Sequence, residues 1–260
     1  MYKNLLIALS ALLLLSSLVY ADRLADIKSA GILKAGVKFD FKPFGFVNEK
    51  NDVVGFDIDL LKYIAKELGV KVEFQQVTSK TRIPLVVGGQ IDIAAASMTH
   101  KIQRDDAIDF TISYFFDGQS ILVRDDCKAT DAKEFAGKKV GAIQGATSGE
   151  NFKKAVPDAK IVSFQEYPQA IMALKKGKID AVTTDLIWCT TQANDSRGTL
   201  KVTGGTLSTE PYGMGVAENE SNFRDAINFA IQNAVKDGTY TKLYKKWFGK
   251  NPTVLPELWP

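Results

Sequence analysis

The residues most suited to chemistry follow a short apolar run, 91–96, that is interrupted only by Asp92. Such a run is typical of a strand buried on both faces. Ser97 and Thr99 come directly after it, and Arg104 follows in a polar segment. A guanidinium offers a planar fork that matches a carboxylate, and ligands of open α/β sheets bind beyond the carboxyl ends of the strands. These residues therefore predict a site for a small anion. A strand end with a solvated arginine is the alternative.

The elements around this stretch alternate between strand and helix. Apolar runs predict strands at 32–37, 70–77 and 91–96, and helical spacing predicts helices at 57–68 and 82–87. This order implies a mostly parallel sheet with right-handed crossovers. A second such set follows, with strands at 138–143, 161–164 and 179–183. Extended segments near Gln119 and Tyr212 are expected to cross between the two sets, and two helices, 222–236 and 239–248, close the chain.

These patterns predict an α/β protein with two lobes, each a mostly parallel sheet flanked by helices, joined by a two-strand hinge. We expect lobe 1 to be discontinuous, with residues 22–121 and 214–260, and lobe 2 to hold residues 122–213. At 260 residues the chain is long enough for two lobes that each bury a core.

The first 21 residues have the pattern of a secretory signal peptide. Lys3 precedes an apolar run from Leu5 to Val19, and the sequence Val-Tyr-Ala at 19–21 fits a cleavage site. No cysteine lies near the cut, so we expect no lipid anchor. The mature chain should begin near Asp22 and be free in the periplasm.

The composition argues against several classes of function. Lys and Arg number 33 against 30 Asp and Glu, without a basic tract, so we expect no nucleic-acid partner. His100 is the only histidine, so no histidine-based metal site or catalytic triad is available, and no cofactor is implied. Cys127 and Cys189 are candidates for a disulfide in an oxidising compartment; two separate buried thiols are the alternative.

Several motifs in this order resemble the amino-acid-binding proteins of bacterial ABC importers, the family 3 solute-binding proteins with the two-lobe periplasmic fold. The resemblance covers nearly all of the mature chain. It rests on the segments 54–60 (VGFDIDL), 82–92, 98–99 with Arg104, 108–110 (IDF), 137–141 (GKKVG), 144–147 (QGAT) and 180–185 (DAVTTD). One departure is Lys101, where such proteins often carry threonine or serine.

The resemblance implies a binding site for an α-amino acid. Arg104 would hold the ligand α-carboxylate, helped by the Thr147 backbone N–H at a helix N-terminus. Asp185 would take the α-ammonium, and Ser97 and Thr99 would add polar contacts. Phe41 and Phe56 would wall the aliphatic part of the ligand, with plain core packing as the alternative for each.

The other end of the pocket would set the choice of ligand. The resemblance to glutamate/aspartate binders rests on Lys38, Ser79 and Arg82, which follow two successive predicted strands. Two cations there would neutralise a side-chain carboxylate and repel lysine or arginine. Glutamine or asparagine stays open, because an amide can accept from both cations. The alternative is that Lys38 points to solvent and Arg82 pairs locally.

The resulting hypothesis is a non-enzymatic, monomeric receptor that captures glutamate or aspartate and delivers it to a membrane permease. A broader polar amino-acid binder is one alternative. An enzyme resembling cyclohexadienyl dehydratase on the same fold is another; it would need a further acid in the cleft, for which Glu166 and Glu210 are the nearest candidates.

Overall fold

The computed structural model describes residues 22–257, so the predicted signal peptide lies outside the described residues. Lobe 1 contains a five-stranded sheet in the order β5-β1-β6-β14-β7. Strand β1 pairs in parallel with β5 and β6, and β14 runs antiparallel to β6 and β7. The strands are β1 (Ile32–Val37), β5 (Lys71–Gln76), β6 (Ile93–Ala94), β7 (Asp109–Phe110) and β14 (Gly215–Val216).

Strand β6 is shorter than the predicted strand at 91–96. The whole run from Ile91 to Met98 is nevertheless buried. The backbone N–H groups of Asp92 and Ala95 still donate to β1, to the carbonyls of Lys34 and Gly36. The segment therefore lies in the middle of the sheet, as its apolar sequence predicted, and it delivers residues 97–104 to the sheet edge.

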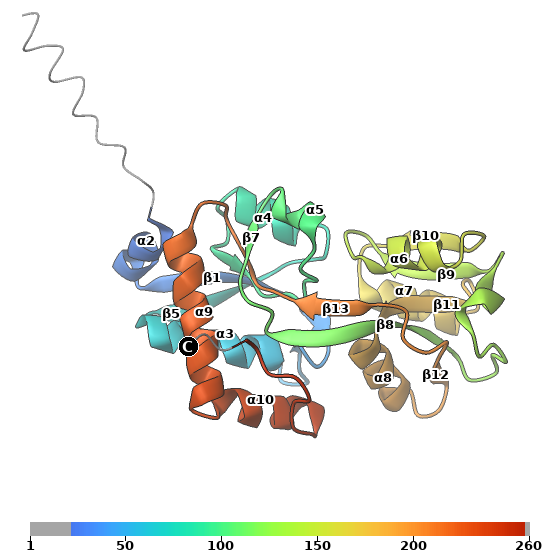
Figure 1. The fold of residues 1–260 in the computed structure, drawn as a ribbon. Coiled ribbons are helices and arrows are strands. Elements are labelled where there is room, and N and C mark those ends of the chain that lie inside the picture. Colours follow the sequence, from blue (N-terminus) through green and yellow to red (C-terminus); the bar gives the residue numbers. More distant parts are fainter. Residues whose placement is uncertain (1–21, 258–260) are drawn as a thin grey trace, which may run out of the picture.

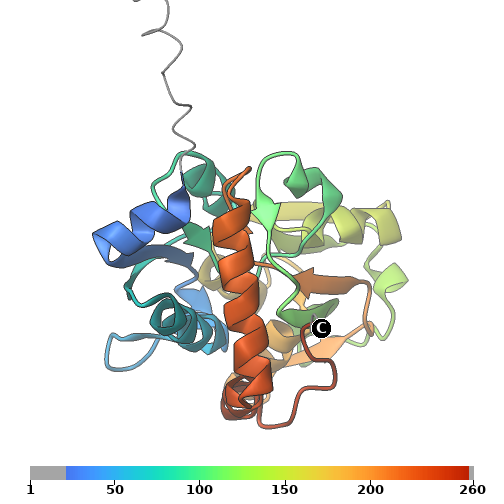
Figure 2. The ribbon, with the colours of Figure 1, turned by 60° about the vertical axis from the view of Figure 1, so that its left-hand side comes forward.

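Six helices and a small sheet complete lobe 1 within the described residues. The long helix α9 crosses the face of the lobe and packs on α3 and α10 (Figure 2). A three-stranded sheet, β2-β3-β4, covers one end of α3. The helices are α2 (Arg23–Ala30), α3 (Phe56–Leu68), α4 (Arg82–Val87), α5 (Ile102–Asp105), α9 (Ser221–Lys236) and α10 (Thr239–Phe248). The small strands are β2 (Asp40–Phe41), β3 (Gly45–Val47) and β4 (Val53–Val54).

Lobe 2 is built on a second sheet, in the order β10-β9-β11-β8-β12. Strand β9 pairs in parallel with β10 and β11, while β8 runs antiparallel to β11 and β12. The strands are β8 (Phe115–Arg124), β9 (Lys139–Ile143), β10 (Lys160–Phe164), β11 (Ala181–Asp185) and β12 (Leu200–Thr203). The helices are η1 (Ala132–Phe135), α6 (Ser148–Ala155), α7 (Tyr167–Lys175) and α8 (Leu186–Asp195).

Two antiparallel strands connect the lobes. The first part of β8, Phe115 to Gly118, pairs with β13 (Thr209–Tyr212), and the rest of β8 belongs to the sheet of lobe 2. The two strands run side by side between the lobes (Figure 1). This is the predicted two-strand hinge. The proposed lobe boundaries, after residues 121 and 213, fall inside β8 and just beyond β13.

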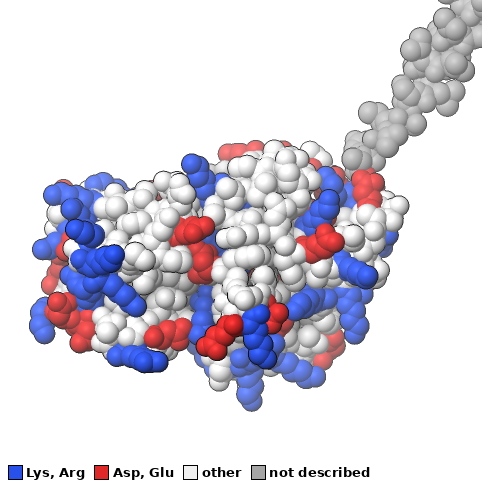
Figure 3. All heavy atoms as spheres, turned by 180° about the vertical axis from the view of Figure 1, so that it is seen from behind, with Lys and Arg blue, Asp and Glu red and all other residues white. Residues whose placement is uncertain are grey.

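The two cysteines do not form a disulfide, and the surface carries charges of both signs (Figure 3). Both thiols are free: Cys127 is half-buried, and buried Cys189 contacts the Thr184 carbonyl at 3.8 Å. The structure therefore lacks the candidate disulfide between Cys127 and Cys189, and of the two thiols only that of Cys189 is buried as the alternative expected. On the face shown in Figure 3, lysine and arginine side chains are spread over both lobes with aspartate and glutamate among them. Within residues 22–257, no helix is both long and apolar enough to span a bilayer.

Candidate functional site

The two lobes are in direct contact across the cleft. The Asp40 carboxylate accepts from the Tyr167 backbone N–H at 3.1 Å, and Lys42 Nζ lies 2.8 Å from the Asp195 carboxylate. Gly145 of lobe 2 approaches lobe 1 so closely that a Cβ atom there would lie 2.5 Å from the Ser79 carbonyl oxygen. Gly145 also has a φ of +79°, so both the lack of space for a Cβ atom and the backbone conformation favour glycine here. The two lobes are therefore closed on each other across the cleft.

The structure brings together the three residues that were predicted to contact the side chain of the ligand: Lys38, Ser79 and Arg82. Lys38, at the end of β1, donates to the Ser79 hydroxyl at 2.9 Å, and both side chains are buried. Arg82, in the first turn of α4, donates through Nη1 to the Ala96 carbonyl at 2.6 Å. Lys38 therefore does not point to solvent, whereas Arg82 does pair with nearby backbone. In the described chain the buried Nε–H of Arg82 has no partner.

Burial dominates the electrostatics of these two cations. It lowers the pKa of Lys38 to about 8 and that of Arg82 to about 9. Nearby carboxylates oppose this shift: Asp40, Asp185 and Asp57 raise the pKa of Lys38, and Asp185 raises that of Arg82. The two cations thus lie in a region that also contains acids.

Arg104 lies at the meeting point of the lobes. Its side chain is buried, with Nη1 donating to the Thr99 carbonyl at 2.6 Å and Nη2 to the Gly145 carbonyl of lobe 2 at 3.0 Å. A guanidinium has five N–H donors, so these two bonds leave three for a ligand. Burial lowers the pKa of Arg104, while Glu210, Asp185 and Glu150 raise it. The arrangement can hold a carboxylate between the lobes.

Ser97 has a role that the sequence did not indicate. Its backbone has a φ of +48°, and its N–H and hydroxyl donate to one oxygen of Asp57, at 3.2 and 3.4 Å. The other Asp57 oxygen accepts from the Tyr114 hydroxyl at 2.9 Å. Burial raises the pKa of Asp57 to about 7, although these bonds and Arg82 lower it. Asp57 thus fixes the turn that carries Ser97 to the cleft.

Asp185 ends β11 and faces the region of the cations. Its carboxylate accepts from the Thr184 hydroxyl at 3.0 Å. Burial and the neighbouring Glu210 raise its pKa, while hydrogen bonds from Tyr212 and Thr184 lower it. Because Asp185 in turn raises the pKa of Lys38, Arg82 and Arg104, its charge acts on all three cations. The ammonium group of a ligand that lies between Asp185 and Arg104 would therefore be next to the Asp185 carboxylate.

The two predicted phenylalanines occupy different environments. Phe41 reaches across the cleft, with its ring centroid 4.8 Å from that of Tyr167 and 6.1 Å from that of Trp188. Lys38 Nζ lies 4.9 Å from the centre of the same Tyr167 ring. Phe41 therefore belongs to an aromatic wall built from both lobes, whose members Tyr167 and Trp188 the sequence analysis missed.

Phe56 corrects the sequence analysis. It is fully buried in lobe 1, where its ring meets those of Phe44, Tyr114 and the helix α10 residues Tyr240 and Phe248. All these partners come from its own lobe. The alternative of core packing therefore fits Phe56, and we leave it out of the proposed ligand contacts. The sequence pattern could not separate it from Phe41, because both follow turns in the same aromatic-rich segment.

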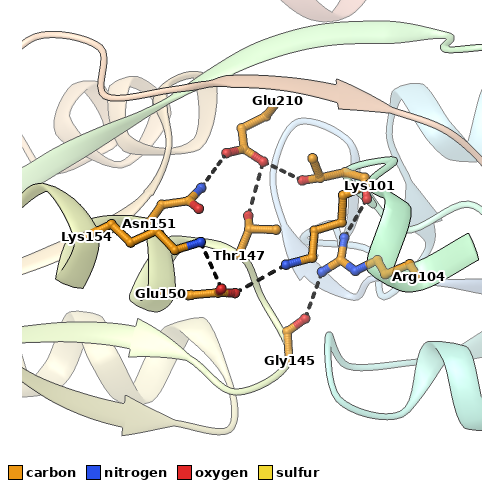
Figure 4. A network of polar contacts seen from close by, with 9 residues as sticks. Lys101, Arg104, Gly145, Thr147, Glu150, Asn151, Lys154 and Glu210 are labelled. Carbon is orange, nitrogen blue, oxygen red and sulfur yellow. Dashed lines mark hydrogen bonds and ion pairs between the residues drawn. The ribbon is translucent and has the colours of Figure 1, made fainter. Parts of the chain in front are cut away.

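Thr99 and Thr147, from different lobes, meet on a residue that the sequence analysis had named only as a candidate acid. Both hydroxyls donate to one oxygen of Glu210, which projects from the hinge strand β13 (Figure 4). Lys101 joins the same interface through an ion pair with Glu150 at 3.2 Å. The signal in the sequence that could have indicated Glu210 was its position in a segment predicted to cross between the lobes.

An apolar hollow at the outer edge of the cleft adjoins the aromatic wall, because Tyr167 and Trp188 line it. It has a volume of about 540 Å³ and is lined by Asp40, Tyr167, Pro168, Ile171, Met172, Lys175, Lys176, Trp188 and Gln192. None of the ten predicted site residues lines it. The buried polar cluster is the better candidate for an amino-acid site, because its charged groups converge. Among residues 22–257, no three His, Cys, Asp or Glu side chains gather to hold a metal ion.

The buried acids predict that the protein is more stable at mildly acidic pH. Burial raises the pKa of Asp57 to about 7 and that of Asp117 to about 8. A carboxyl group with a raised folded-state pKa contributes stability below its unfolded pKa and loses it as pH rises through the folded value. Chemical unfolding should therefore show a larger free energy of unfolding at pH 5.5 than at pH 7.5, by roughly 2 kcal/mol for each of the two acids. The lowered pKa of Lys38 affects the free energy of unfolding mainly at pH values above this range.

Matched variants check the origin of that pH dependence. Asp57→Asn and Asp117→Asn should each flatten the dependence, and Asp158→Asn, at an exposed position, should leave it unchanged. A free energy of unfolding that stays level or rises from pH 5.5 to 7.5 would contradict the raised pKa values.

Comparison with known proteins identifies the family and relatives of this chain. Residues 33–250 match the family "Bacterial extracellular solute-binding proteins, family 3". The ABC transporter glutamine-binding protein GlnH of Bacillus subtilis is 38% identical over 236 residues, which cover 89% of this chain and 86% of that protein. A glutamine-binding protein of Geobacillus stearothermophilus is 40% identical over 209 residues, covering 78% of this chain and 79% of that one.

A solved structure agrees with the fold as well as with the sequence. An ancestral arginine-binding protein bound to glutamine superposes with a TM-score of 0.82 and 40% sequence identity, covering 85% of this chain and 99% of that one. The fold, the hinge and the family match therefore lead to one conclusion: the chain belongs to the bacterial extracellular solute-binding proteins, family 3.

Proposed function

We propose that this protein is an extracytoplasmic receptor that captures glutamine and delivers it to the permease of an ABC importer. Glutamine replaces the glutamate or aspartate expected from the sequence. The proposal rests on the group around Lys38 and Arg82. Both cations have N–H donors left for a ligand, and neighbouring carboxylates already counteract part of their positive charge. The glutamine-binding relatives support it.

The α-amino-acid end of the ligand would lie between Arg104 and Asp185. Arg104 would receive the α-carboxylate on its three remaining N–H groups, with the Thr147 backbone N–H beside it. Asp185 would receive the α-ammonium, with Ser97 and Thr99 as further polar contacts. Phe41 would cover the aliphatic carbons, together with Tyr167 and Trp188, whose rings pack against it. This half of the site would serve any α-amino acid.

The side-chain end would recognise an oxygen acceptor. The Arg82 Nε–H is buried without a partner among the described residues, and an unmet buried donor costs about 1–3 kcal/mol. Lys38 uses one of its three N–H donors on Ser79. A ligand carbonyl oxygen placed here would accept from both groups. Lysine or arginine as ligand would offer only donors and a repelled charge.

The charge balance favours an amide over a carboxylate. Asp40, Asp57 and Asp185 already act on Lys38, and Arg82 already lowers the pKa of Asp57. A glutamate side chain would add a further negative charge to this buried group, which costs desolvation energy unless it is fully compensated. A glutamine amide offers the same acceptor oxygen and adds no net charge. Glutamine is therefore the better match.

Titration calorimetry with glutamine, glutamate, asparagine, aspartate and arginine tests this proposal. Wild-type protein should bind glutamine most tightly. The double variant Lys38→Met/Arg82→Gln should weaken glutamine binding by about 1.5–3 kcal/mol for each charge-assisted bond lost. Lys34→Met, at an exposed position of the same strand β1, serves as the control and should bind like wild type. Tighter binding of glutamate or of arginine by the wild type would overturn the choice of glutamine.

The remaining parts of the proposal follow from a receptor role. The protein would act as a monomer in the periplasm, without catalysis. A dehydratase on this scaffold would need a free acid in the cleft, and the candidate Glu210 instead accepts four hydrogen bonds from the protein itself. A prephenate turnover assay should therefore detect no product.

A further inference from the structure

The buried carboxylate of Glu210 connects the hinge to both lobes. Its side chain is 2% exposed and lies on β13. One oxygen accepts from the Thr99 hydroxyl at 2.6 Å and the Thr147 hydroxyl at 3.1 Å. The other accepts from Asn151 Nδ2 at 3.0 Å and from the Ser208 hydroxyl at 2.5 Å. Every partner is a donor, so an ionised carboxylate is fully satisfied here.

The partners of Glu210 belong to the two halves of the proposed site. Thr99 precedes α5, which carries Arg104, and its carbonyl accepts from that arginine. Thr147 and Asn151 lie at the start and in the first turns of α6 in lobe 2. Figure 4 shows the Glu210 carboxylate facing Asn151 and Thr147, with the Arg104–Gly145 contact that also joins the lobes farther below. One side chain on the hinge thus fixes residues on both sides of the cleft.

The charge of Glu210 reaches both proposed clamps of the ligand. It raises the pKa of Arg104 and that of Asp185. Each threonine hydroxyl has a single hydrogen, and Glu210 accepts both. The lone pairs that remain on these hydroxyls are acceptors, which suits an ammonium group rather than a carboxylate. The same contact therefore leaves the two threonine hydroxyls as acceptors for the α-ammonium, while the Thr147 backbone N–H remains available to the α-carboxylate.

We propose that Glu210 is a positioning residue that bonds to the binding threonines of both lobes and thereby stabilises the closed, ligand-holding arrangement. The roles given to Thr99, Thr147 and Arg104 rest on the proposed function. The contacts to Glu210 use only protein atoms, so they act on lobe closure with or without ligand. The inference predicts that loss of these contacts opens the cleft and releases ligand faster.

Stopped-flow kinetics and small-angle scattering test this on three substitutions of Glu210. Glu210→Leu removes all four contacts and should raise the ligand dissociation rate at least tenfold, with an association rate within about threefold of wild type. Without ligand, it should show a larger radius of gyration. Glu210→Asp keeps the charge but withdraws it from the threonines, and it should behave similarly; it keeps the test valid if the leucine variant does not fold.

Rescue by glutamine separates positioning from general damage. Glu210→Gln retains an oxygen that accepts from both threonines, and Asn151 can turn its amide to accept from the new NH₂ group. Its dissociation rate should stay within about threefold of wild type. Thr209→Ala, at the exposed neighbouring position of β13, is the control and should match wild type.

The outcomes distinguish this inference from the proposed function. Wild-type protein that binds another amino acid, or none, contradicts the glutamine proposal, yet scattering of wild type against Glu210→Leu still decides the role of Glu210. Unchanged scattering together with unchanged dissociation rates would overturn the inference. A loss of affinity in Glu210→Leu that comes only from slower association would also overturn the inference.

Discussion

Replacing Arg104 with alanine is expected to remove most binding of every amino-acid ligand. The guanidinium is buried between the lobes, and its three remaining donors are the only proposed bidentate partner for the α-carboxylate. Without it, that carboxylate would be buried and unpaired, which costs about 2–5 kcal/mol, or roughly 30- to several-thousand-fold in affinity. Titration calorimetry measures the loss directly.

Two further variants show whether this loss is specific. Arg104→Lys keeps the charge but not the planar fork, so its affinity should fall between those of wild type and Arg104→Ala. Arg224→Ala removes a partly exposed arginine of lobe 1 that pairs with Asp225, and it should bind like wild type. Because Arg104 also bonds to Thr99 and Gly145, thermal unfolding should verify that each variant is folded. An affinity of Arg104→Ala within a few-fold of wild type would misplace the site.

Asp185→Asn is expected to cause a comparable loss. The substitution keeps the shape of the side chain and an acceptor oxygen, but it leaves the α-ammonium of the ligand without a compensating charge. The expected cost is again about 2–5 kcal/mol. The variant should lose affinity for all amino acids alike, because the contact is to the part of the ligand that they share. Asp158→Asn, on the surface of lobe 2, is the matched control.

The pH dependence of binding gives Asp185 a second test. Burial and Glu210 raise the pKa of Asp185, so its carboxylate takes up a proton at a higher pH than an ordinary aspartate. Because the ammonium binds the ionised form, wild-type affinity should weaken as pH falls through this raised value. Asp185→Asn should lack that step. Equal pH profiles for the two proteins would contradict the assignment of Asp185 to the ammonium.

Much of the fold follows from local sequence patterns. The buried run 91–98 and strand β1 have the apolar residues of central strands, edge strand β5 alternates apolar and polar residues, and α3 repeats apolar residues at helical spacing. The alternation of these elements implies parallel pairing with crossovers. The polar residues Lys38, Ser79 and Asp185 could therefore be placed at strand ends from the sequence, and the family resemblance then assigned them to one cleft.

Other features required the assembled chain. Phe41 and Phe56 are the same residue type in the same segment, but Phe41 meets Trp188 of the other lobe and Phe56 meets Phe248 of the last helix. The burial of Lys38 depends on Ser79 and Tyr167, which are distant in sequence. Local periodicity tells which face of an element is buried, but it does not tell which distant segment covers that face.

Electrostatic character was the least accessible property. The sequence indicated two cations for the side-chain end of the ligand, which favoured an acidic amino acid. The structure places Asp57 and Asp185 close enough to raise the pKa of Lys38, and Asp185 also raises that of Arg82. The sequence by itself determined which residues stand at the strand ends, because periodicity is local. Only the tertiary structure decided which charges share one buried space, because a pKa and a hydrogen bond such as that of Thr99 with Glu210 depend on all neighbours at once.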